Sequence, residues 1–372
     1  MAPTTATLHT AALLREAFAA LPFSGVDAQA AGVSVDRLRQ ALRWGLVTRV
    51  RRGWYVVADA LTDPVGAHPR DEPGARSVGP AALALVRELR ERGVTPVIAG
   101  SLSARWWQTD LPAGGRPGDG RSRGPRCVGD RASIGGAVGP TPLILVRPGS
   151  GIRRGMRHGI LIREASLDER DVVRTESGLM FTSVTRTGID CARGLDPVSA
   201  FIIINSAVRR SLDPQWPTSA RPRPDSGRLT DLACDQARTQ AALDAFRATL
   251  ERCSGRGLSS VRRVMALVDP RLESALESLS WWRFGEHGLV MPIPQRWVRG
   301  ASGRRYRVDF DFGSVIGEAD GLGKYSDASQ LRAEKSRQMD IELGGRPVMR
   351  WGWSAMWNYP EQVIHALERA AA

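Results

Sequence analysis

The stretch Tyr306-Arg-Val-Asp-Phe-Asp-Phe-Gly-Ser-Val-Ile-Gly-Glu-Ala-Asp-Gly321 contains two short runs in which apolar and acidic residues alternate. The first run carries Asp309 and Asp311, and the second carries Glu318 and Asp320. Alternate residues of a strand share one face, so each run predicts a strand with two carboxylates on the same side. Because only a short turn separates the runs, the strands are expected to be adjacent.

Four carboxylates that point into one site would repel one another strongly without a compensating positive charge. A divalent cation, Mg²⁺ or Mn²⁺, supplies that charge; it can also polarise a phosphate and lower the pKa of an attacking water. Lys324, four residues past Asp320, is one of two lysines beside fifty arginines. Its position predicts that it orients the nucleophile or neutralises the transition state.

The flanking sequence predicts the rest of an α/β core. The segment 271–284 has apolar residues at helical spacing, and it carries Glu273 and Glu277 one turn apart. A strand is expected near 294–298, a helix over 331–342 and a final strand over 347–353. The order helix, three strands, helix, strand predicts a mixed sheet flanked by helices.

Five ordered motifs in this region resemble the C-terminal domain of actinobacterial proteins similar to the DUF559 and very-short-patch-repair endonuclease group. They are SxLES around Glu277, VDF at 308–310, GExDGxxKY at 317–325, EKxR at 334–337 and RW at 350–351. The resemblance implies a PD-(D/E)XK fold, like that of restriction endonucleases. In such a fold Asp309 and Glu318 would bind the metal, and Glu277 would complete the site.

This chain departs from the nuclease signature at one position. The residue two places after the second acid is usually lysine, and here it is Asp320. Lys324 would then supply the charge from a shifted position. Asp311 is not required by the pattern, and we interpret it as a surface acid or one that supports the site from behind.

Several functions remain open for this constellation. In one, the protein is a Mg²⁺-dependent endodeoxyribonuclease that hydrolyses phosphodiester bonds with Asp309, Glu318, Asp320, Lys324 and Glu277. In another, the fold is catalytically silent and serves DNA binding or dimerisation, as in an antitoxin-like transcriptional regulator. A third possibility is an enzyme that uses the same acids on RNA or on a nucleotide. The tryptophans at 351, 353 and 357 are interpreted as packing residues rather than base-stacking ones.

The first sixty residues predict two short helices followed by a hairpin. Helical spacing covers 11–20 and 27–44, and the second stretch is broken where Ser34 can cap a helix starting at Val35. Two alternating runs over 46–57, joined by Arg-Arg-Gly, predict the hairpin. This order is the outline of a winged helix, whose second helix enters the major groove of DNA while the wing contacts the backbone.

Positive charge is concentrated in the same segment. Six arginines are expected to contact DNA: Arg37, Arg39, Arg43, Arg49, Arg51 and Arg52. A solvated helix face in an arginine-rich chain is the alternative interpretation. The net charge of +13 is by itself a weak indicator, because a GC-rich genome also produces excess arginine.

The N-terminal and middle regions resemble AbiEi-type antitoxins. The first resemblance spans roughly fifty residues, including Ala30-Ala-Gly-Val-Ser34 and Arg49-Val-Arg-Arg-Gly53, and it implies DNA binding. The second is a TSxxRTxxD pattern that begins at Thr182. Its Arg186 and Asp190, spaced i and i+4, are expected to form a structural salt bridge.

These patterns predict an α/β multidomain protein. The expected parts are a winged helix (1–62), a middle α/β domain (81–210) with a disordered insertion (111–140), a loop or linker (211–230), a helical connector (231–270) and a nuclease-like domain (271–372). The middle domain is expected to contain a strand and helix over 94–107, further strands at 143–146 and 159–162, and a buried helix around 201–208.

Cysteine spacing and hydropathy limit the other classes. The four cysteines are far apart and form no CxxC pair, so neither a zinc knuckle nor a redox motif is predicted. No stretch approaches eighteen apolar residues and no basic leader is present, so we expect a cytoplasmic protein that has no membrane partner. DNA is the expected partner, with a toxin or a second copy of the chain as further possibilities.

Overall fold

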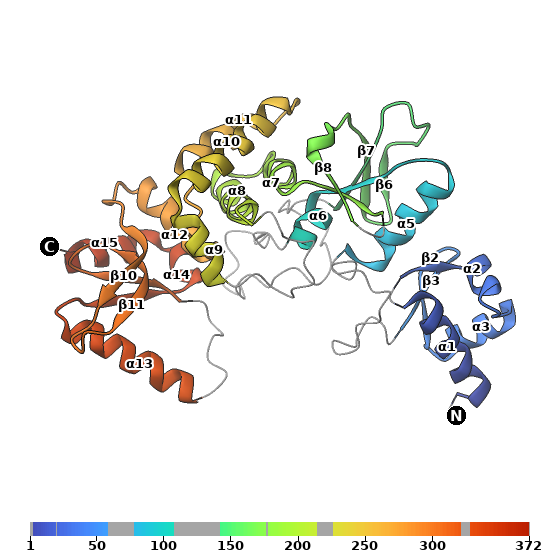
Figure 1. Ribbon diagram of the computed structural model, residues 1–372, viewed down its shortest axis with the longest axis horizontal. Helices are drawn as coiled ribbons and strands as arrows, with labels where there is room; N and C mark the ends of the chain where they lie inside the picture. The colour runs from blue at the N-terminus through green and yellow to red at the C-terminus, as the bar shows by residue number, and fades with distance from the viewer. Residues whose placement is uncertain are drawn as a thin grey trace. The chain divides into compact units, whose positions relative to one another are not determined.

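The computed structural model describes residues 3–19, 21–58, 78–107, 142–175, 178–213, 226–320 and 328–371 (Figure 1). The described residues form two compact units and three sheets. The first unit contains the described residues up to 183, and the second contains those from 184 onward. The protein is therefore a mixed α/β chain with more than one domain, as predicted.

The first unit begins with a small module of residues 3–19 and 21–58, which we call the N-terminal module. Its elements are α1 (Thr5–Phe18), β1 (Phe23–Ser24), α2 (Gly25–Ala30), α3 (Val35–Arg43), β2 (Val47–Arg51) and β3 (Trp54–Val57). The strands form one sheet in the order β1-β3-β2. The side chain of Ser34 accepts a hydrogen bond from the backbone N–H of Arg37, which confirms the predicted cap. The core joins the helices to the sheet through Leu14, Phe23, Ala28, Val33, Leu38, Ala41, Val47 and Val57.

The rest of the first unit is a six-stranded mixed sheet in the order β6-β7-β5-β4-β9-β8. Its elements are α5 (Pro80–Glu91), β4 (Val97–Ala99), α6 (Gly100–Trp107), β5 (Pro142–Val146), β6 (Gly155–Arg157), β7 (Ile160–Glu164), a 3-10 turn (Glu169–Asp171), β8 (Val172–Arg174) and β9 (Met180–Thr182). The strand and helix expected over 94–107 are confirmed, as are the strands near 143 and 160. The predicted insertion at 111–140 lies outside the described residues.

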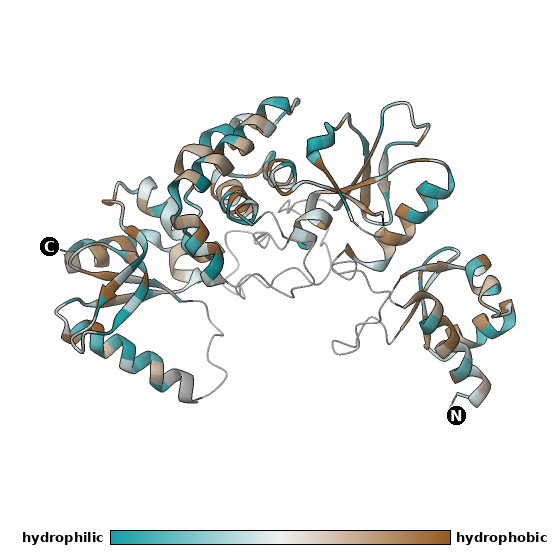
Figure 2. Cartoon of the chain, viewed as in Figure 1, coloured by the Kyte–Doolittle hydropathy of each residue, from teal (hydrophilic) through white to brown (hydrophobic). Residues whose placement is uncertain are grey.

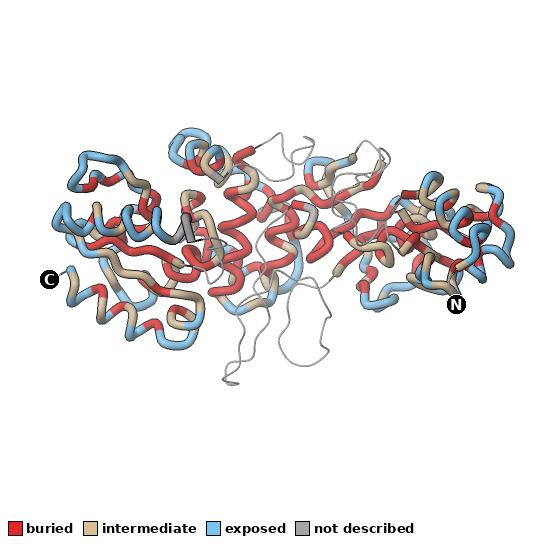
Figure 3. The backbone as a smooth tube through the Cα atoms, turned by 90° about the horizontal axis from the view of Figure 1, so that it is seen from below, coloured by how far each residue is buried: buried red, intermediate tan, exposed pale blue. Residues whose placement is uncertain are grey.

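The second unit begins with a layer of helices. They are α7 (Val184–Ala192), α8 (Pro197–Ser211), α9 (Ser226–Cys234), α10 (Gln236–Arg252), α11 (Leu258–Val264) and a 3-10 turn (Met265–Leu267). Helix α8 is buried along almost its whole length, and the buried helical turns are red in Figure 3. A Cβ at Gly188 of α7 would lie 2.6 Å from the Cβ of Ala207, so only glycine allows α7 to pack this closely against α8.

Two predicted boundaries differ from the structure in this layer. Residues 184–210 were expected to belong with the middle sheet, but α7 and α8 cluster with the later helices because α8 packs against α11 and α12. The expected loop over 211–230 ends earlier, because α9 begins at Ser226 and buries Leu229; residues 214–225 lie outside the described residues. The predicted salt bridge within α7 is confirmed, since Arg186 Nε lies 2.8 Å from Asp190 Oδ2.

A four-stranded mixed sheet follows, in the order β10-β11-β12-β13. Its strands are β10 (Ile293–Arg299), β11 (Arg305–Asp311), β12 (Ile316–Ala319) and β13 (Val348–Trp351). The first three run antiparallel, and β12 pairs with β13 in parallel. The predicted order of helix, three strands, helix and strand is confirmed for 271–353.

Helices cover this C-terminal sheet. They are α12 (Ala275–Glu286), α13 (Ala328–Leu343), α14 (Trp353–Asn358) and α15 (Pro360–Ala371). In Figure 1, α13 lies to one side of β10 and β11, whereas α12, α14 and α15 lie to the other. The ring of Phe284 on α12 packs edge-on against Phe310 and Trp351, while Ile341 of α13 joins Val298 and Val308. Most of the described residues of α13 are hydrophilic, as the teal of Figure 2 shows.

Candidate functional site

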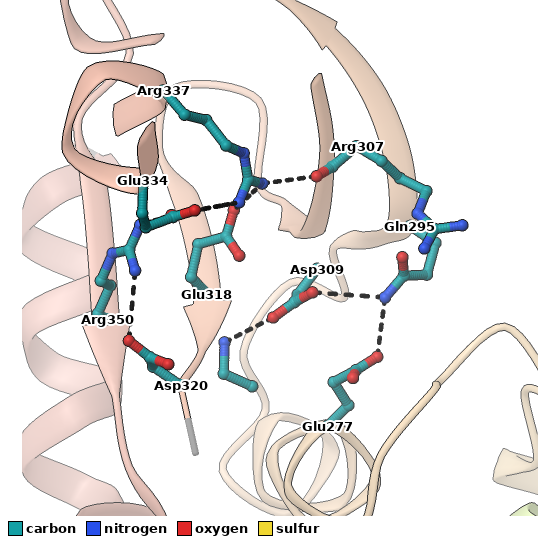
Figure 4. A network of polar contacts seen from close by, with 10 residues as sticks. Glu277, Gln295, Arg307, Asp309, Glu318, Asp320, Glu334, Arg337 and Arg350 are labelled. Atoms are coloured by element: carbon teal, nitrogen blue, oxygen red, sulfur yellow. Dashed lines mark hydrogen bonds and ion pairs between the residues drawn. The ribbon is translucent and has the colours of Figure 1, made fainter. Parts of the chain in front are cut away.

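The structure brings the predicted acids together at one end of the C-terminal sheet. Glu277 lies on α12, Asp309 on β11 and Glu318 on β12, and Asp320 follows β12 directly. Phe310 pairs with Gly317 across β11 and β12, which places Asp309 beside Glu318. Figure 4 shows Asp309 between Glu277 and Glu318. Glu277, Asp309 and Glu318 are therefore close in space although they lie on a helix and two strands that are separate in the sequence.

Glu277 is buried in the first turn of α12, with 5% of its surface exposed. Its Oε1 accepts a hydrogen bond from the Ser274 hydroxyl at 2.8 Å, and its Oε2 accepts one from the backbone N–H of Glu273 at 2.8 Å. Burial and the nearby charge of Asp309 together raise the pKa of Glu277 to about 8. These donors hold the carboxyl group in place, although its surroundings disfavour the charged form.

Gln295 connects Glu277 to Asp309. Its Nε2 lies 2.9 Å from Glu277 Oε2 and 3.5 Å from Asp309 Oδ1. The side chain is buried, and the backbone has a φ of 55°, a left-handed conformation that is unusual for a residue with a side chain. Such conformations persist where the surroundings enforce them, often at functional sites. Gln295 was not predicted as a site residue, because nothing in the sequence marks a glutamine within a strand as a bridge between two acids.

Asp309 also bonds the neighbouring strand directly. Its Oδ2 accepts a hydrogen bond from the backbone N–H of Ala319 at 2.8 Å. The carboxylate thereby joins the two strands just where β12 ends. It lies close enough to both Glu277 and Glu318 for its charge to raise the pKa of each.

Glu318 is buried, with 7% of its surface exposed, and it faces two arginines. Its Oε1 lies 2.8 Å from Nη2 of Arg337 on α13, and β12 pairs Glu318 directly with Arg350 of β13. Burial and the charge of Asp309 raise the pKa of Glu318 to about 8, although both arginines oppose that shift. The two nearby cations therefore compensate the charge of the acid only in part.

The arginines hold further acids in the same network. Arg350 pairs with Asp320, with 3.3 Å between Nη1 and Oδ2, and with Glu334 of α13. Arg337 also contacts Glu334 at 3.3 Å and donates a hydrogen bond to the backbone carbonyl of Arg307 at 2.6 Å. Burial disfavours the charged form of Glu334, but the hydrogen bond from Arg350 and the two guanidinium charges outweigh it and lower its pKa.

Arg337 and Arg350 belong to the EKxR and RW motifs of the sequence, yet the motifs did not reveal which acids they would bind. Asp320, at the position where the nuclease signature usually has lysine, is paired with Arg350. Lys324, which was expected to supply the missing charge, lies outside the described residues. Among the described residues, arginines supply the positive charge beside these acids.

The carboxylates can be compared with the needs of a divalent cation. No group of three or more histidine, cysteine, aspartate or glutamate side chains gathers closely enough to hold a metal within the described parts of the chain. Mg²⁺ is often bound by one or two carboxylates, with water and substrate phosphates completing its coordination. Asp309 and Glu318 fit that mode, since they are adjacent oxygen donors whose mutual repulsion a cation would relieve.

Asp311 has a different place from the one its spacing suggested. It is buried rather than on the surface, and it pairs with Arg346 and, at 3.2 Å, with Arg296. Its Oδ1 also accepts the backbone N–H of Gly313 at 2.9 Å. Because Asp311 lies at the end of β11, these contacts fix the turn into β12.

Five of the six predicted DNA-contacting arginines are exposed. Three lie on α3 and two on the hairpin or its turn: Arg37, Arg39, Arg43, Arg49 and Arg52. Arg39 forms an exposed ion pair with Asp36, with 3.0 Å between Nη1 and Oδ1. The buried residues Leu38 and Ala41 orient α3, so that its arginines face solvent.

Arg51 is the exception, and its predicted contact with DNA does not agree with the structure. Its side chain is 8% exposed and pairs with Glu88 of α5. The register of β2 and β3 shifts between Arg49 and Arg51, which turns Arg51 away from the exposed side. Next to Glu88, Arg87 pairs with Asp27 at 3.2 Å, so both cations bind the N-terminal module to α5.

The tryptophans of the C-terminal region pack, as predicted for Trp351. Trp351 is buried, and its Nε1 donates a hydrogen bond to the Ser280 hydroxyl at 2.8 Å. The rings of Trp353 and Trp357 stack on each other, with centroids 5.5 Å apart. Over the part of the chain that the structure describes, no helix is both long and apolar enough to cross a membrane.

Comparison with known proteins finds two similar sequences in Mycobacterium tuberculosis. The uncharacterized protein MT2308 of strain CDC 1551 / Oshkosh is 22% identical over 221 residues, which is 59% of this chain and 70% of the relative. The uncharacterized protein Rv2248 of strain ATCC 25618 / H37Rv has the same identity and coverage. No family model matches the chain, and no solved structure matches it.

Proposed function

We propose that this protein binds DNA and that its C-terminal domain is a metal-dependent endonuclease of the PD-(D/E)XK kind, which hydrolyses phosphodiester bonds. The observation that carries the proposal is the buried cluster of Glu277, Asp309 and Glu318 on a helix and two adjacent strands. The helix and strand order, 271–353, supports the same fold. Buried carboxylates that repel one another are costly to a fold, which supports a functional reason for keeping them together.

Asp309 and Glu318 are the residues that would hold Mg²⁺ or Mn²⁺. When bound, the ion would supply charge for the phosphate and lower the pKa of the attacking water. Gln295 holds the carboxyl groups of Glu277 and Asp309 at fixed positions. Glu277, whose pKa is raised to about 8, can hold or release a proton at its carboxylate near neutral pH.

The proposed DNA contacts lie in the N-terminal module, which has the element order of a winged helix. Its three-stranded sheet and capped α3 support that assignment. Exposed arginines on α3 would approach the major groove, while Arg49 and Arg52 on the hairpin would contact phosphates. Neither set of contacts specifies a DNA sequence.

A second function is favoured by one observation. Arg350 pairs with Asp320 where the nuclease signature usually carries a lysine, and Arg337 pairs with Glu318. Internal ion pairs of this kind are the arrangement expected if the acids serve structure alone. The protein would then be an antitoxin-like transcriptional regulator, in which the N-terminal module acts and the nuclease fold is silent.

Cleavage of supercoiled plasmid by the purified full chain distinguishes these functions. We expect nicking in Mg²⁺ or Mn²⁺, and a loss of at least about 100-fold in Asp309→Asn and in Glu318→Gln. Asp244→Asn is the matched control, because Asp244 is an exposed acid on α10 and should leave the rate unchanged.

Equal nicking by wild type and Asp309→Asn would show that the catalytic assignment is wrong. If the chain binds duplex DNA but cleaves no DNA or RNA with either ion, the regulator is the correct function. If the chain cleaves RNA but not DNA, and Asp309→Asn abolishes this cleavage, the assigned site is correct and the substrate is RNA.

A further inference from the structure

The hairpin formed by β10 and β11 exposes an aromatic residue beside two exposed arginines. Trp297 is 55% exposed, whereas the other tryptophans whose side chains the structure describes are buried or half-buried. A single exposed apolar side chain is common on protein surfaces, whereas a contiguous binding surface needs suitable neighbours. The neighbours of Trp297 therefore decide what it can bind.

Those neighbours are arginines held in register by the strand pairing. Trp297 pairs with Arg307, and Arg299 pairs with Arg305, so the four side chains share one face of the hairpin. We call Trp297, Arg299 and Arg305 the hairpin face. The opposite side carries Val298, which packs into the core.

The hairpin face is preorganised and positively charged. The guanidinium of Arg305 lies over the ring of Trp297, 5.4 Å from its centroid, which restrains the indole. Arg299 and Arg305 are exposed, and neither forms an ion pair with a carboxylate in the described parts of the chain. An aromatic ring flanked by unneutralised cations suits a base with its phosphates, since the ring stacks and the cations bind phosphate.

The hairpin face is continuous with the acids. Arg305, Arg307 and Asp309 alternate along β11 and so lie on one side of the strand. The side chain of Arg307 pairs with Glu273 at 2.9 Å, and the backbone of Glu273 bonds Glu277. In Figure 4 the side chain of Arg307 extends toward Gln295, which bridges Glu277 and Asp309. Arg307 therefore lies between the hairpin face and Asp309 along β11.

We propose that the hairpin face binds an unpaired segment of a DNA strand, with a base stacked on Trp297 and phosphates held by Arg299 and Arg305. The identity of the polymer as DNA rests on the proposed function. Stacking requires an accessible base face, which a single strand offers and an intact duplex does not. A second copy of this chain is a poorer occupant, because two hairpin faces would bring arginine against arginine.

Fluorescence anisotropy of labelled oligonucleotides tests the proposal. The full chain carries Arg37→Ala, Arg43→Ala and Arg49→Ala throughout, so that the N-terminal module contributes little to the signal. Binding to a fifteen-residue oligo-dT is measured in EDTA, where no cleavage occurs. We expect Trp297→Ala to weaken binding roughly 10-fold and Trp297→Phe to retain most of the affinity.

Tyr359→Ala is the matched control, because Tyr359 is an aromatic residue of similar exposure, 53%, away from the hairpin. It should bind oligo-dT like the unmodified background. Arg305→Gln should weaken binding and also reduce its dependence on salt, because one phosphate contact is lost.

Equal affinity of Trp297→Ala and the background for oligo-dT would overturn the proposal. Binding of oligo-U or of duplex DNA, without binding of oligo-dT, would overturn it as well. A dimer in sedimentation that depends on Trp297, with no effect on oligonucleotides, would assign the hairpin face to a second copy instead. Because oligonucleotide binding is measured in EDTA, it does not depend on whether the chain cleaves plasmid. The two proposals can therefore fail separately: a chain that cleaves plasmid but binds oligo-dT without Trp297 would contradict only the proposal for the hairpin face.

Discussion

The N-terminal module and the C-terminal sheet both depend on arginine, but they place it in opposite surroundings. Arg37, Arg43 and Arg49 extend into solvent from α3 and β2. Arg337 and Arg350 lie half-buried among Glu318, Asp320 and Glu334. The comparison shows that arginine content alone does not identify a nucleic-acid surface, because the same side chain serves as an external charge in one region and an internal counter-ion in the other.

Arg51 shows that neighbouring arginines of one strand can differ in this way, one exposed to solvent and the other paired internally. It lies two residues from exposed Arg49 on the same strand, yet it is buried against Glu88. The shift in register between the two residues decides the difference. Exposure and partner, rather than position in a charged run, therefore predict what an arginine does.

The largest effect on folding is expected from Arg337→Ala. Above about pH 8, where Glu318 is ionised, the substitution leaves its buried carboxylate without the guanidinium that pairs with it. It also removes a hydrogen bond to the carbonyl of Arg307. Because Arg337 is 25% exposed, water screens part of the loss, and we expect the free energy of unfolding to fall by about 3 kcal/mol. Urea unfolding followed by circular dichroism measures it.

Arg247→Ala is the control for this substitution, since Arg247 forms an exposed pair with Asp244 on α10. Its expected loss is under about 0.5 kcal/mol. Similar losses for the two variants would mean that Arg337 is not an internal counter-ion, and the comparison between the two regions would then fail.

A smaller effect, seen as a change in pH dependence, is expected from Glu277→Gln. The pKa of Glu277 is raised from an ordinary value of 4.5 to about 8, so the folded chain holds a proton there that the unfolded chain has lost. Between these values the contribution of Glu277 lowers stability as pH rises, and above about 8 the full penalty is present. The glutamine of the variant cannot ionise. Between pH 5 and pH 8 we therefore expect the free energy of unfolding of the variant to fall by on the order of 2 kcal/mol less than that of wild type.

Urea unfolding at pH 5, 6, 7 and 8 gives this difference directly. The substitution removes one carboxyl group, so the difference between the two proteins reports Glu277 together with its interaction with Asp309. Parallel stability profiles would mean that Glu277 ionises normally in the folded protein and that its burial is relieved by groups other than those described above.

The smallest effect on folding is expected from the exposed arginines. We expect the triple substitution of Arg37, Arg43 and Arg49 by Ala to change stability by less than about 0.5 kcal/mol. It should nevertheless weaken binding to duplex DNA and reduce the slope of log affinity against log salt by about 2 to 3, because up to three phosphate contacts are lost.

Arg51→Ala sharpens the same comparison. It should leave the salt slope unchanged while destabilising the first unit by roughly 1 to 2 kcal/mol, because Glu88 loses its partner. A salt slope reduced by Arg51→Ala, or unchanged in the triple variant, would contradict the assignment of the DNA surface.

Much of the fold could be predicted from the sequence, because hydrophobic period and turn residues act locally. The cap at Ser34, the hairpin after α3, and the strands around Asp309 and Glu318 follow from such patterns. Helices α14 and α15 were not predicted, although Gly352 and Pro360 mark where they begin. The middle sheet was predicted only strand by strand, since pairing order depends on contacts between distant segments.

The candidate site was predicted less completely than the fold. The acids follow from alternation along two strands, but their partners depend on tertiary contacts. Gln295 and Arg350 reach the acids from β10 and β13, and no local pattern marks either role. Alternation also did not indicate that Asp311 would be buried in ion pairs with Arg346 and Arg296.

The parallel pairing of β12 with β13 has a consequence for the order in which the chain folds. Strands β10, β11 and β12 are joined by short turns and can meet early, but Arg350 is 30 residues beyond its partner Asp320. During synthesis the carboxylates therefore emerge well before the cations that accompany them. Until α13 and β13 are made, water solvates these acids better than the incomplete sheet does. The burial of Glu318 and Asp320 therefore waits for Arg337 and Arg350.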